Sequence, residues 1–182
     1  DAGNSAAVAS GRRNPGAGRF VNFYYNGTDI YNDVSVNYCV HEMFAEKQAD
    51  TLVIRFNDTK GIWSKWQPAA GDTVRFKEGA SDTGKMFIHS MKPENGLFTI
   101  RAMSMPKTAK IRKSKSWEGV RFLQLANEFA GNHGLTFKNY GCEDQVYPYI
   151  KQDNEGDFSL FSRLCMLEGC QMLIFDGSLL AY

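Results

Sequence analysis

The sequence predicts an α+β protein, in which an N-terminal antiparallel β-barrel precedes a small α/β module of helix, strand, helix and hairpin. Short stretches in which apolar and polar residues alternate, separated by turn dipeptides, run through residues 19–105. Apolar residues at helical spacing become prominent only after residue 115. These patterns divide the chain into a flexible N-terminal arm (1–18), a β-barrel domain (19–105), a basic linker (106–115) and an α+β domain (116–182).

The composition is that of an ordinary globular protein. Hydrophobic residues make up 43% and charged residues 23% of the 182 residues. The formal net charge of +1 gives no overall field that would favour nucleic acid or an anionic membrane. No apolar run approaches the roughly 20 residues that span a bilayer, and the N-terminus shows no apolar signal region. We therefore expect no membrane anchoring.

The predicted barrel follows an arm of small, polar and Gly-rich residues, which buries too little to offset the entropy of ordering. Residues 20–25 lead into Asn26-Gly27, a dipeptide favoured in two-residue hairpins. Alternation recurs at residues 52–56 and 72–77, and two further strands flank a Pro- and Gly-containing turn at residues 92–96. Short strands separated by turns in this way are typical of a small barrel or sandwich.

Trp63 and Trp66 lie in a loop-like segment between two predicted strands. Two tryptophans at this spacing can form a platform for stacking sugars, or they can plug one end of the barrel. The plug is the favoured interpretation, because large aromatic side chains more often fill cores than bind ligands.

The linker carries five cations within residues 107–115: Lys107, Lys110, Arg112, Lys113 and Lys115. Such a run is usually a solvated connector. The run has no interleaved aromatic residues, on which the bases of a single-stranded nucleic acid normally stack. Nucleic-acid binding is therefore disfavoured.

The first helical pattern of the α+β domain covers residues 116–131, where apolar residues recur on one side. Gly131 or Gly134 is expected to provide the C-cap. His133 lies in that capping loop with no partner evident in the sequence, so we expect a solvated ring or a helix-end cation.

The second helical pattern lies within residues 152–169, and both of its ends are specified. Asn154 is the expected N-cap, and Asp157 stands three residues later, where a capping-box acid belongs. Gly169 is expected to end the helix. The chain then closes with a hairpin around Asp176-Gly177.

No catalytic or nucleotide-binding motif is present, and we predict no catalytic, cofactor or metal site. Glu143-Asp144 and Glu155 with Asp157 offer the paired carboxylates that a glycosidase needs, but they are better explained as turn and cap residues. Four residues have the right chemistry for zinc but match no zinc-binding spacing: His133, Cys142, Cys165 and Cys170. Reduced, partly buried thiols are the favoured interpretation.

The order of motifs along the chain is more informative than any single motif. The run LQLANEFAGNHGL, an extended segment ending in Gln152, an acidic start, FSLFSRL and an Asp-Gly hairpin follow one another. This order resembles the late-control or baseplate hub family of contractile-tailed phages and related phage-derived particles. The matching positions are Gln152, Glu155, Gly156, Asp157, Phe158, Phe161, Arg163, Leu164 and Gly169.

Gly156 stands where the family more usually has Ser, a departure expected to weaken the first turn of the helix. In the N-terminal half, ADTLVIRFND, WSKWQPAAGDTVRF and TGKMFIHSM are similar to the first barrel of the family. The resemblance covers roughly residues 20–182.

The resemblance implies a structural protein with no enzymatic activity and no cofactor. Hub proteins of this family consist of two β-barrels and an α/β insert, and they form a trimeric ring that joins the hexameric tail tube to the central spike. The implied partners are the chain itself, the tube, the spike and other baseplate proteins. Tape-measure protein and DNA pass through the lumen. The implied location is the virion tail baseplate, assembled in the cytoplasm of the bacterial host. On this basis we expect the chain to be a fragment that lacks the second barrel.

Two other functions are alternatives to the hub function. A cell-wall or glycan-binding module of a tail would use Trp63, Trp66 and the tyrosines at 24–25 and 147–149. A tail-associated hydrolase would use the carboxylates in residues 143–157.

Overall fold

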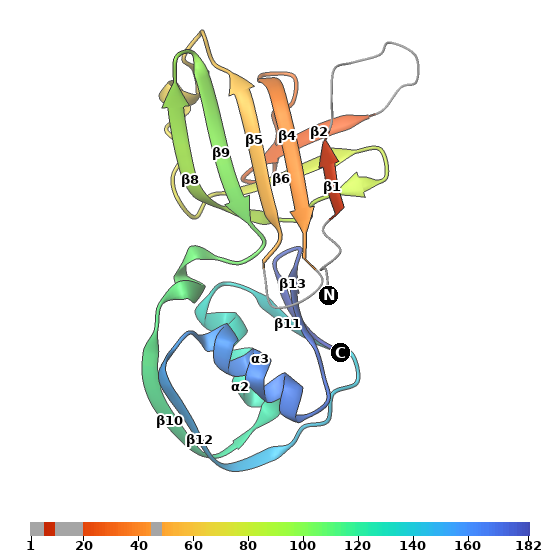
Figure 1. The fold of residues 1–182 in the computed structure, drawn as a ribbon, viewed down its shortest axis with the longest axis vertical. Helices are drawn as coiled ribbons and strands as arrows, with labels where there is room; N and C mark the ends of the chain where they lie inside the picture. The colour runs from red at the N-terminus through yellow and green to blue at the C-terminus, as the bar shows by residue number, and fades with distance from the viewer. Residues whose placement is uncertain (1–5, 10–19, 45–48) are drawn as a thin grey trace. The chain divides into compact units, whose positions relative to one another are not determined.

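The computed structural model describes residues 6–9, 20–44 and 49–182. The chain divides into two compact units, Asp1–Lys107 (unit 1) and Thr108–Tyr182 (unit 2). The fold is mixed, with mostly antiparallel sheets and few helices (Figure 1). Within the described ranges, no helix is both long enough and apolar enough to cross a membrane.

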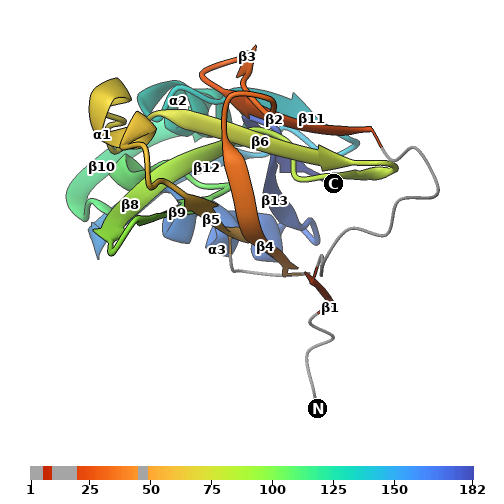
Figure 2. The same cartoon turned by 90° about the horizontal axis from the view of Figure 1, so that it is seen from above.

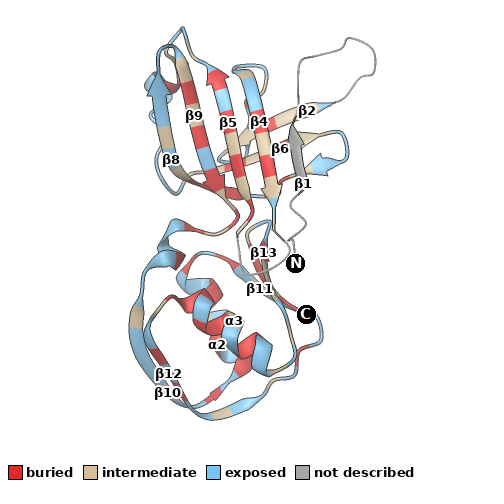
Figure 3. Cartoon of the chain, in the orientation of Figure 1, coloured by how far each residue is buried: buried red, intermediate tan, exposed pale blue. Residues whose placement is uncertain are grey.

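Unit 1 is built on one nine-stranded sheet. Its strands are β1 (Ala6–Ala9), β2 (Val21–Tyr25), β3 (Thr28–Asp29), β4 (Ser35–Met43), β5 (Thr51–Asn57), β6 (Thr73–Glu78), β7 (Ser81–Asp82), β8 (Met86–Glu94) and β9 (Leu97–Met103). They pair in the order β1-β4-β5-β9-β8-β6-β2-β3, with β7 beside β6. Buried and more exposed residues alternate along β5 and β9, because one face of the sheet covers the core (Figure 3).

Two hairpins of this sheet turn at Asn-Gly dipeptides. Asn26 and Gly27 have φ of 46° and 84°, and Asn95 and Gly96 have φ of 49° and 75°. Two consecutive positive φ values are what a type I′ turn requires. The turn predicted at 92–96 is therefore confined to its last two residues, and Pro93 belongs to β8.

The sheet curls strongly around its core. Phe23 of β2 and Phe56 of β5 lie 5.3 Å apart between ring centroids, although three strands separate β2 from β5 in the sheet order. Figure 2 shows β2 and β6 running across the direction of β4. Among the described residues the pairing ends at β1 and β3 and does not join them. Closure into a barrel therefore stays a prediction.

Part of the predicted arm is a strand. Ala6–Ala9 form β1, which pairs antiparallel with β4 from Val40 to Met43. The remaining residues of that arm, 1–5 and 10–18, lie outside the described residues.

Unit 2 has two α-helices, a 3-10 helix at its start and two small sheets. Its elements are the 3-10 helix η1 (Lys107–Lys110, which begins at the unit boundary), β10 (Lys113–Arg121), α2 (Phe122–Asn132), β11 (Thr136–Asn139), β12 (Val146–Glu155), α3 (Asp157–Leu167), β13 (Met172–Phe175) and β14 (Ser178–Ala181). Strands β10 and β12 form an antiparallel ribbon, and β11-β14-β13 form a sheet in which β11 and β14 are parallel.

Phe161 of α3 lies at the centre of the unit 2 core. Its ring stacks on Phe122 at 5.1 Å, and the rings of Phe129 and Phe137 meet it edge-on. The apolar side of α3 therefore packs against α2 and β11.

The first helix begins later than predicted. Residues 113–121 form β10 because they pair with β12, which is more than twenty residues away in sequence. Gly119 has a φ of 58°, which a right-handed helix cannot contain. The predicted helix over 116–131 was therefore wrong at its start, whereas Gly134, with a φ of 68°, provides the predicted C-terminal glycine.

The second helix also begins later than predicted, at Asp157. Asn154 is not the N-cap: it has a φ of 47° and donates its backbone N–H to Ser114 Oγ at 3.1 Å. Gly156 is the N-cap residue. The prediction for the other end is confirmed, because Gly169 has a φ of 70° and Cys170 N–H donates to Cys165 C=O at 2.7 Å, closing a Schellman motif.

Candidate functional site: a buried polar clamp around Asp157

Asp157, the first residue of α3, is a carboxylate with only 1% of its surface exposed. Buried carboxylates need partners, and Asp157 has four. Its Oδ2 accepts hydrogen bonds from Lys113 Nζ at 2.9 Å, His133 Nε2 at 3.0 Å and Asn132 Nδ2 at 3.2 Å. Its Oδ1 accepts one from Gln152 Nε2 at 2.9 Å. One carboxylate thus gathers donors from β10, β12 and the end of α2.

The surroundings of Asp157 favour the charged form of its carboxylate. The carboxylate lies at the N-terminus of α3, where the helix dipole favours a negative charge. Burial alone would raise the pKa of Asp157, but the hydrogen bonds from Gln152, Lys113 and Asn132 outweigh it, so the pKa is lower than usual. Asp157 is therefore ionised at neutral pH.

His133 is buried and its ring is neutral, whereas the sequence predicted a solvated ring or a helix-end cation. Burial lowers its pKa, and the nearby Asp157 only partly opposes this effect. Since a carboxylate can only accept, Nε2–H faces Asp157 and Nδ1 accepts from the Thr108 hydroxyl at 2.9 Å.

The segment at residues 108–113 is docked on unit 2 at three points. We call residues 108–112 the connector. Thr108 binds His133, and Gly156 approaches the carbonyl oxygen of Ala109 so closely that a Cβ would lie 2.8 Å from it. Lys113, the first residue of β10 and the residue that follows the connector, binds Asp157. Most of residues 108–115 are exposed, but these contacts fix the segment within unit 2. We refer to Thr108, Lys113, Asn132, His133, Gln152, Gly156 and Asp157 as the Asp157 clamp.

The residues that carry the family resemblance have structural partners. Gln152 Nε2 also donates to the Glu155 carbonyl at 2.9 Å, and Glu155 pairs with Arg163 at 2.8 Å. The departure at Gly156 does not simply weaken a turn: a Ser side chain there would meet the Ala109 carbonyl.

The basic run is partly neutralised within unit 2. Lys113 pairs with Asp157, while Lys115 pairs with Glu128 at 2.6 Å and lies 4.7 Å from the centroid of the Trp117 ring. These two cations hold β10 to α2 and α3.

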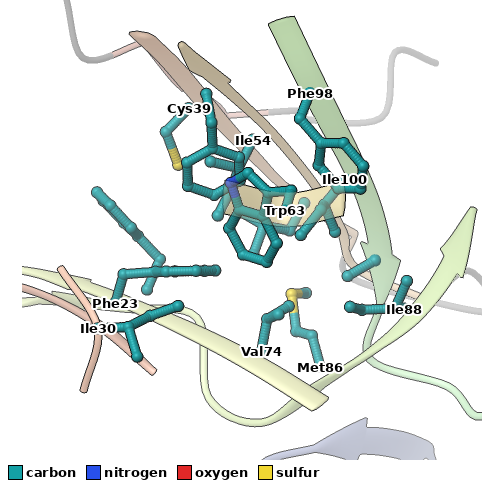
Figure 4. Packing of buried hydrophobic residues seen from close by; sticks show 14 residues of the cluster. Phe23, Ile30, Cys39, Ile54, Trp63, Val74, Met86, Ile88, Phe98 and Ile100 are labelled. Carbon is teal, nitrogen blue, oxygen red and sulfur yellow. The ribbon is translucent and has the colours of Figure 1, made fainter. Parts of the chain in front are cut away.

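The two tryptophans of unit 1 have different environments. Trp63 of α1 (Ile62–Trp66) is 1% exposed and stacks on Phe98 with ring centroids 5.3 Å apart (Figure 4). Trp66 is 40% exposed and meets the edge of Trp63. Trp63 therefore fills the core, as the plug interpretation predicts, and a two-tryptophan sugar platform is not available.

The tyrosines suggested for glycan binding are partly engaged as well. The Tyr25 hydroxyl donates to Asp72, and the Tyr147 hydroxyl donates to Glu168 at 2.6 Å. Tyr149 is 57% exposed, but it belongs to unit 2, whereas Trp66 belongs to unit 1.

Asp144 has a role that the sequence only partly revealed. Its Oδ1 accepts from the Leu123 backbone N–H at 2.9 Å, which caps α2, and its Oδ2 pairs with Arg121 at 3.2 Å. The cap comes from a loop that follows the helix in sequence, so no local pattern could reveal it. Asp144 and Asp157 are both occupied in holding helix ends.

The suggested zinc ligands do not form a set. Both ring nitrogens of His133 are engaged by Thr108 and Asp157. In the part of the chain that the structure describes, no group of three or more His, Cys, Asp or Glu side chains is arranged to hold a metal ion.

The fold matches known tail proteins. The 43 kDa tail protein of prophage MuSo2 from Shewanella oneidensis aligns over 90% of this chain and 53% of its own, with a TM-score of 0.61 and 13% identity. The tail protein from Neisseria meningitidis MC58 aligns over 91% of this chain and 50% of its own, with a TM-score of 0.64 and 11% identity.

A third match is the E. coli c3393 protein, described as a type VI secretion component with structural similarity to the T4 tail proteins gp27 and gp5. It has a TM-score of 0.50 and 12% identity, over 97% of this chain and 48% of its own. This chain thus spans about half the length of the structures it matches, with which it shares a fold. No protein-family model and no curated protein sequence matches it.

Proposed function

We propose that this chain is a structural subunit of the baseplate hub of a contractile phage-type tail and has no catalytic activity. The observation that supports this most is the fold shared with two tail proteins over 90% and 91% of the chain. The resemblance of the segment from Gln152 to Gly169 to the hub family points the same way.

In the proposed hub, three copies form a ring between the hexameric tail tube and the central spike, beside other baseplate proteins. Unit 1 is the first barrel of the subunit and unit 2 is its α/β insert. Tape-measure protein and DNA pass through the lumen. The ring is assembled in the bacterial cytoplasm and remains in the tail baseplate of the particle.

An incompletely covered sheet edge supports assembly through unit 1. Strand β1 pairs only with the last four residues of β4, so among the described strands residues 35–39 have no neighbour on that side. Unpaired main-chain groups at a sheet edge can bind a strand of another chain. The proposed neighbour is the next copy of the subunit.

The Asp157 clamp supports a structural use of unit 2. An adaptor works by holding its contact surfaces at fixed positions, and the clamp joins the connector, β10, β12 and both α-helices. Three of the carboxylates suggested for a hydrolase have structural partners: Asp144 caps α2, Glu155 pairs with Arg163 and Asp157 lies in the clamp. The glycan hypothesis loses its main support because Trp63 is buried.

Light scattering and electron microscopy of the full-length natural protein test the proposal. We expect a trimer and a ring with a central channel. A strict monomer at tens of micromolar would count against the hub. Wall glycan fragments are expected to leave the tryptophan fluorescence unchanged, and a saturable change would instead support the glycan-binding module.

A further inference from the structure

Unit 2 contains three cysteines whose thiols are free: Cys142, Cys165 and Cys170. Cys142 and Cys165 are buried, and Cys170 is partly exposed. None of them belongs to the Asp157 clamp.

The sheet topology brings Cys142 and Cys170 to the same end of one sheet. Asn139, the last residue of β11, lies opposite Ala181 of β14, and Ala181 lies opposite Met172, the first residue of β13. Cys142 follows Asn139 by three residues, and Cys170 precedes Met172 by two. The two cysteines therefore leave the sheet on either side of the C-terminal end of β14.

Both backbones are held in place at this end. Asn139 binds the backbone N–H and the C=O of Cys142 through its side chain, both at 2.9 Å. The N–H of Cys170 donates to the Cys165 carbonyl, and the next residue, Gln171, bonds to Tyr182 at the end of β14. Hydrogen bonds thus hold both loops that carry the two thiols.

The side chains of Cys142 and Cys170 also interact, and Cys170 Sγ donates to the Glu168 carbonyl at 3.8 Å. Burial and a side-chain hydrogen bond with Cys170 raise the pKa of Cys142 to about 12. Burial also raises the pKa of Cys165, to about 12. Cys142 and Cys165 are therefore protonated at neutral pH, and the partly exposed Cys170 is the thiol that a reagent can reach.

We propose that Cys142 and Cys170 form an intramolecular disulfide when the protein meets a disulfide oxidant such as oxidised glutathione. The Cys170 thiolate attacks one sulfur of the oxidant, and one reduced glutathione leaves. Cys142 loses its proton and attacks the sulfur of Cys170 in the mixed disulfide, and the second reduced glutathione leaves. The protein loses two hydrogen atoms, and the oxidant is reduced to two thiols.

The bond would close a loop that contains β12 and α3, the elements that carry Gln152 and Asp157. A disulfide stabilises mainly by constraining the unfolded chain, more so for longer loops. If the chain is part of a tail, as proposed above, it is made in a reducing cytoplasm and oxidised after the particle leaves the cell. The thiol pair itself does not depend on that function.

The test uses the reduced full chain exposed to excess oxidised glutathione, followed by alkylation, digestion and mass spectrometry. We expect a peptide in which Cys142 is linked to Cys170, while Cys39 and Cys165 remain alkylated. The melting temperature of unit 2 should rise by at least roughly 5 °C relative to the reduced protein.

Two variants make the test specific. Cys170→Ser should abolish the linked peptide and the rise in melting temperature, and because Cys170 is partly exposed, this variant is expected to fold. Cys39→Ala, a substitution in unit 1, should still give the linked peptide and the rise in melting temperature. Four alkylated cysteines, a bond that includes Cys165, or a glutathione that persists on Cys170 would each overturn the proposal. Because the isolated chain is used, failure here is independent of whether the protein forms a hub.

Discussion

Replacing Asp157 by alanine should strongly destabilise unit 2. The change removes a buried acceptor of four hydrogen bonds and leaves the donors of Asn132, His133 and Gln152 without it. Removing one partner of a buried charged pair typically costs about 3–5 kcal/mol. Lys113 moderates the loss, because its side chain is 39% exposed and can be rehydrated. We therefore expect a loss of about 3–4 kcal/mol in the free energy of unfolding of unit 2.

Hydrogen exchange followed by mass spectrometry reports on unit 2 separately from unit 1. Peptides from α2, α3 and the connector should exchange faster by roughly two orders of magnitude or more, since each 1.4 kcal/mol of lost stability is a factor of about ten. The matched control is Asp153→Asn, whose side chain is 71% exposed and pairs with Lys151 at 3.1 Å. It should change the stability by less than about 0.5 kcal/mol. If Asp157→Ala exchanged no faster than Asp153→Asn, the clamp would not hold unit 2 together.

Three further predictions follow from individual contacts. Gly156→Ala should destabilise unit 2 by about 1–3 kcal/mol in urea unfolding, because its Cβ would meet the Ala109 carbonyl oxygen. Gly131→Ala, in the last turn of α2, where a Cβ would meet nothing within 4 Å, should stabilise unit 2 by about 0.5–1 kcal/mol. If both substitutions changed the stability of unit 2 alike, the close approach of Gly156 to Ala109 would not matter. Trp63→Ala should lower the free energy of unfolding of unit 1 by about 3–5 kcal/mol, because Trp63 is buried in its core. Trp66→Ala should lower it by about 1 kcal/mol or less, because Trp66 is 40% exposed. If thermal unfolding showed equal losses for the two variants, Trp63 would not fill the core. Because the folded-state pKa of His133 is lower than its unfolded value of about 6.5, its contribution to stability is complete above that pH and is lost as the pH falls below it. His133→Asn should therefore show a smaller loss of stability between pH 7.5 and about 5.5 than the wild type, and an unchanged slope would refute a neutral buried ring.

The sequence predicted best what depends on a few adjacent residues. The Asn26-Gly27 and Asp176-Gly177 turns form as expected, and Asp176 and Gly177 have φ of 47° and 70°. The glycines that end α2 and α3 were also found, because a positive φ is a local demand. The alternation in β5 and β9 was visible because one face of each strand is buried.

The sequence failed where distant segments decide the structure. Residues 116–121 were assigned to the first helix because Val120 continues its apolar side, but they belong to strand β10 because β12 pairs with them. Asp157 looked like a capping residue, since nothing local indicates that Lys113 and His133 converge on it. The connector looked like a solvated linker because its contacts, to His133 and Gly156, come from later elements. The clamp is a tertiary feature, and only the resemblance singled out part of it.

Electron microscopy of tail particles from the organism in which this protein occurs, labelled with gold-coupled antibodies against the chain, tests the hub proposal most directly. We predict label at the tip of the tail tube, at the baseplate, with one ring per particle. Label spread along the tube or the sheath, or intact particles that contain none of this protein, would contradict the proposal.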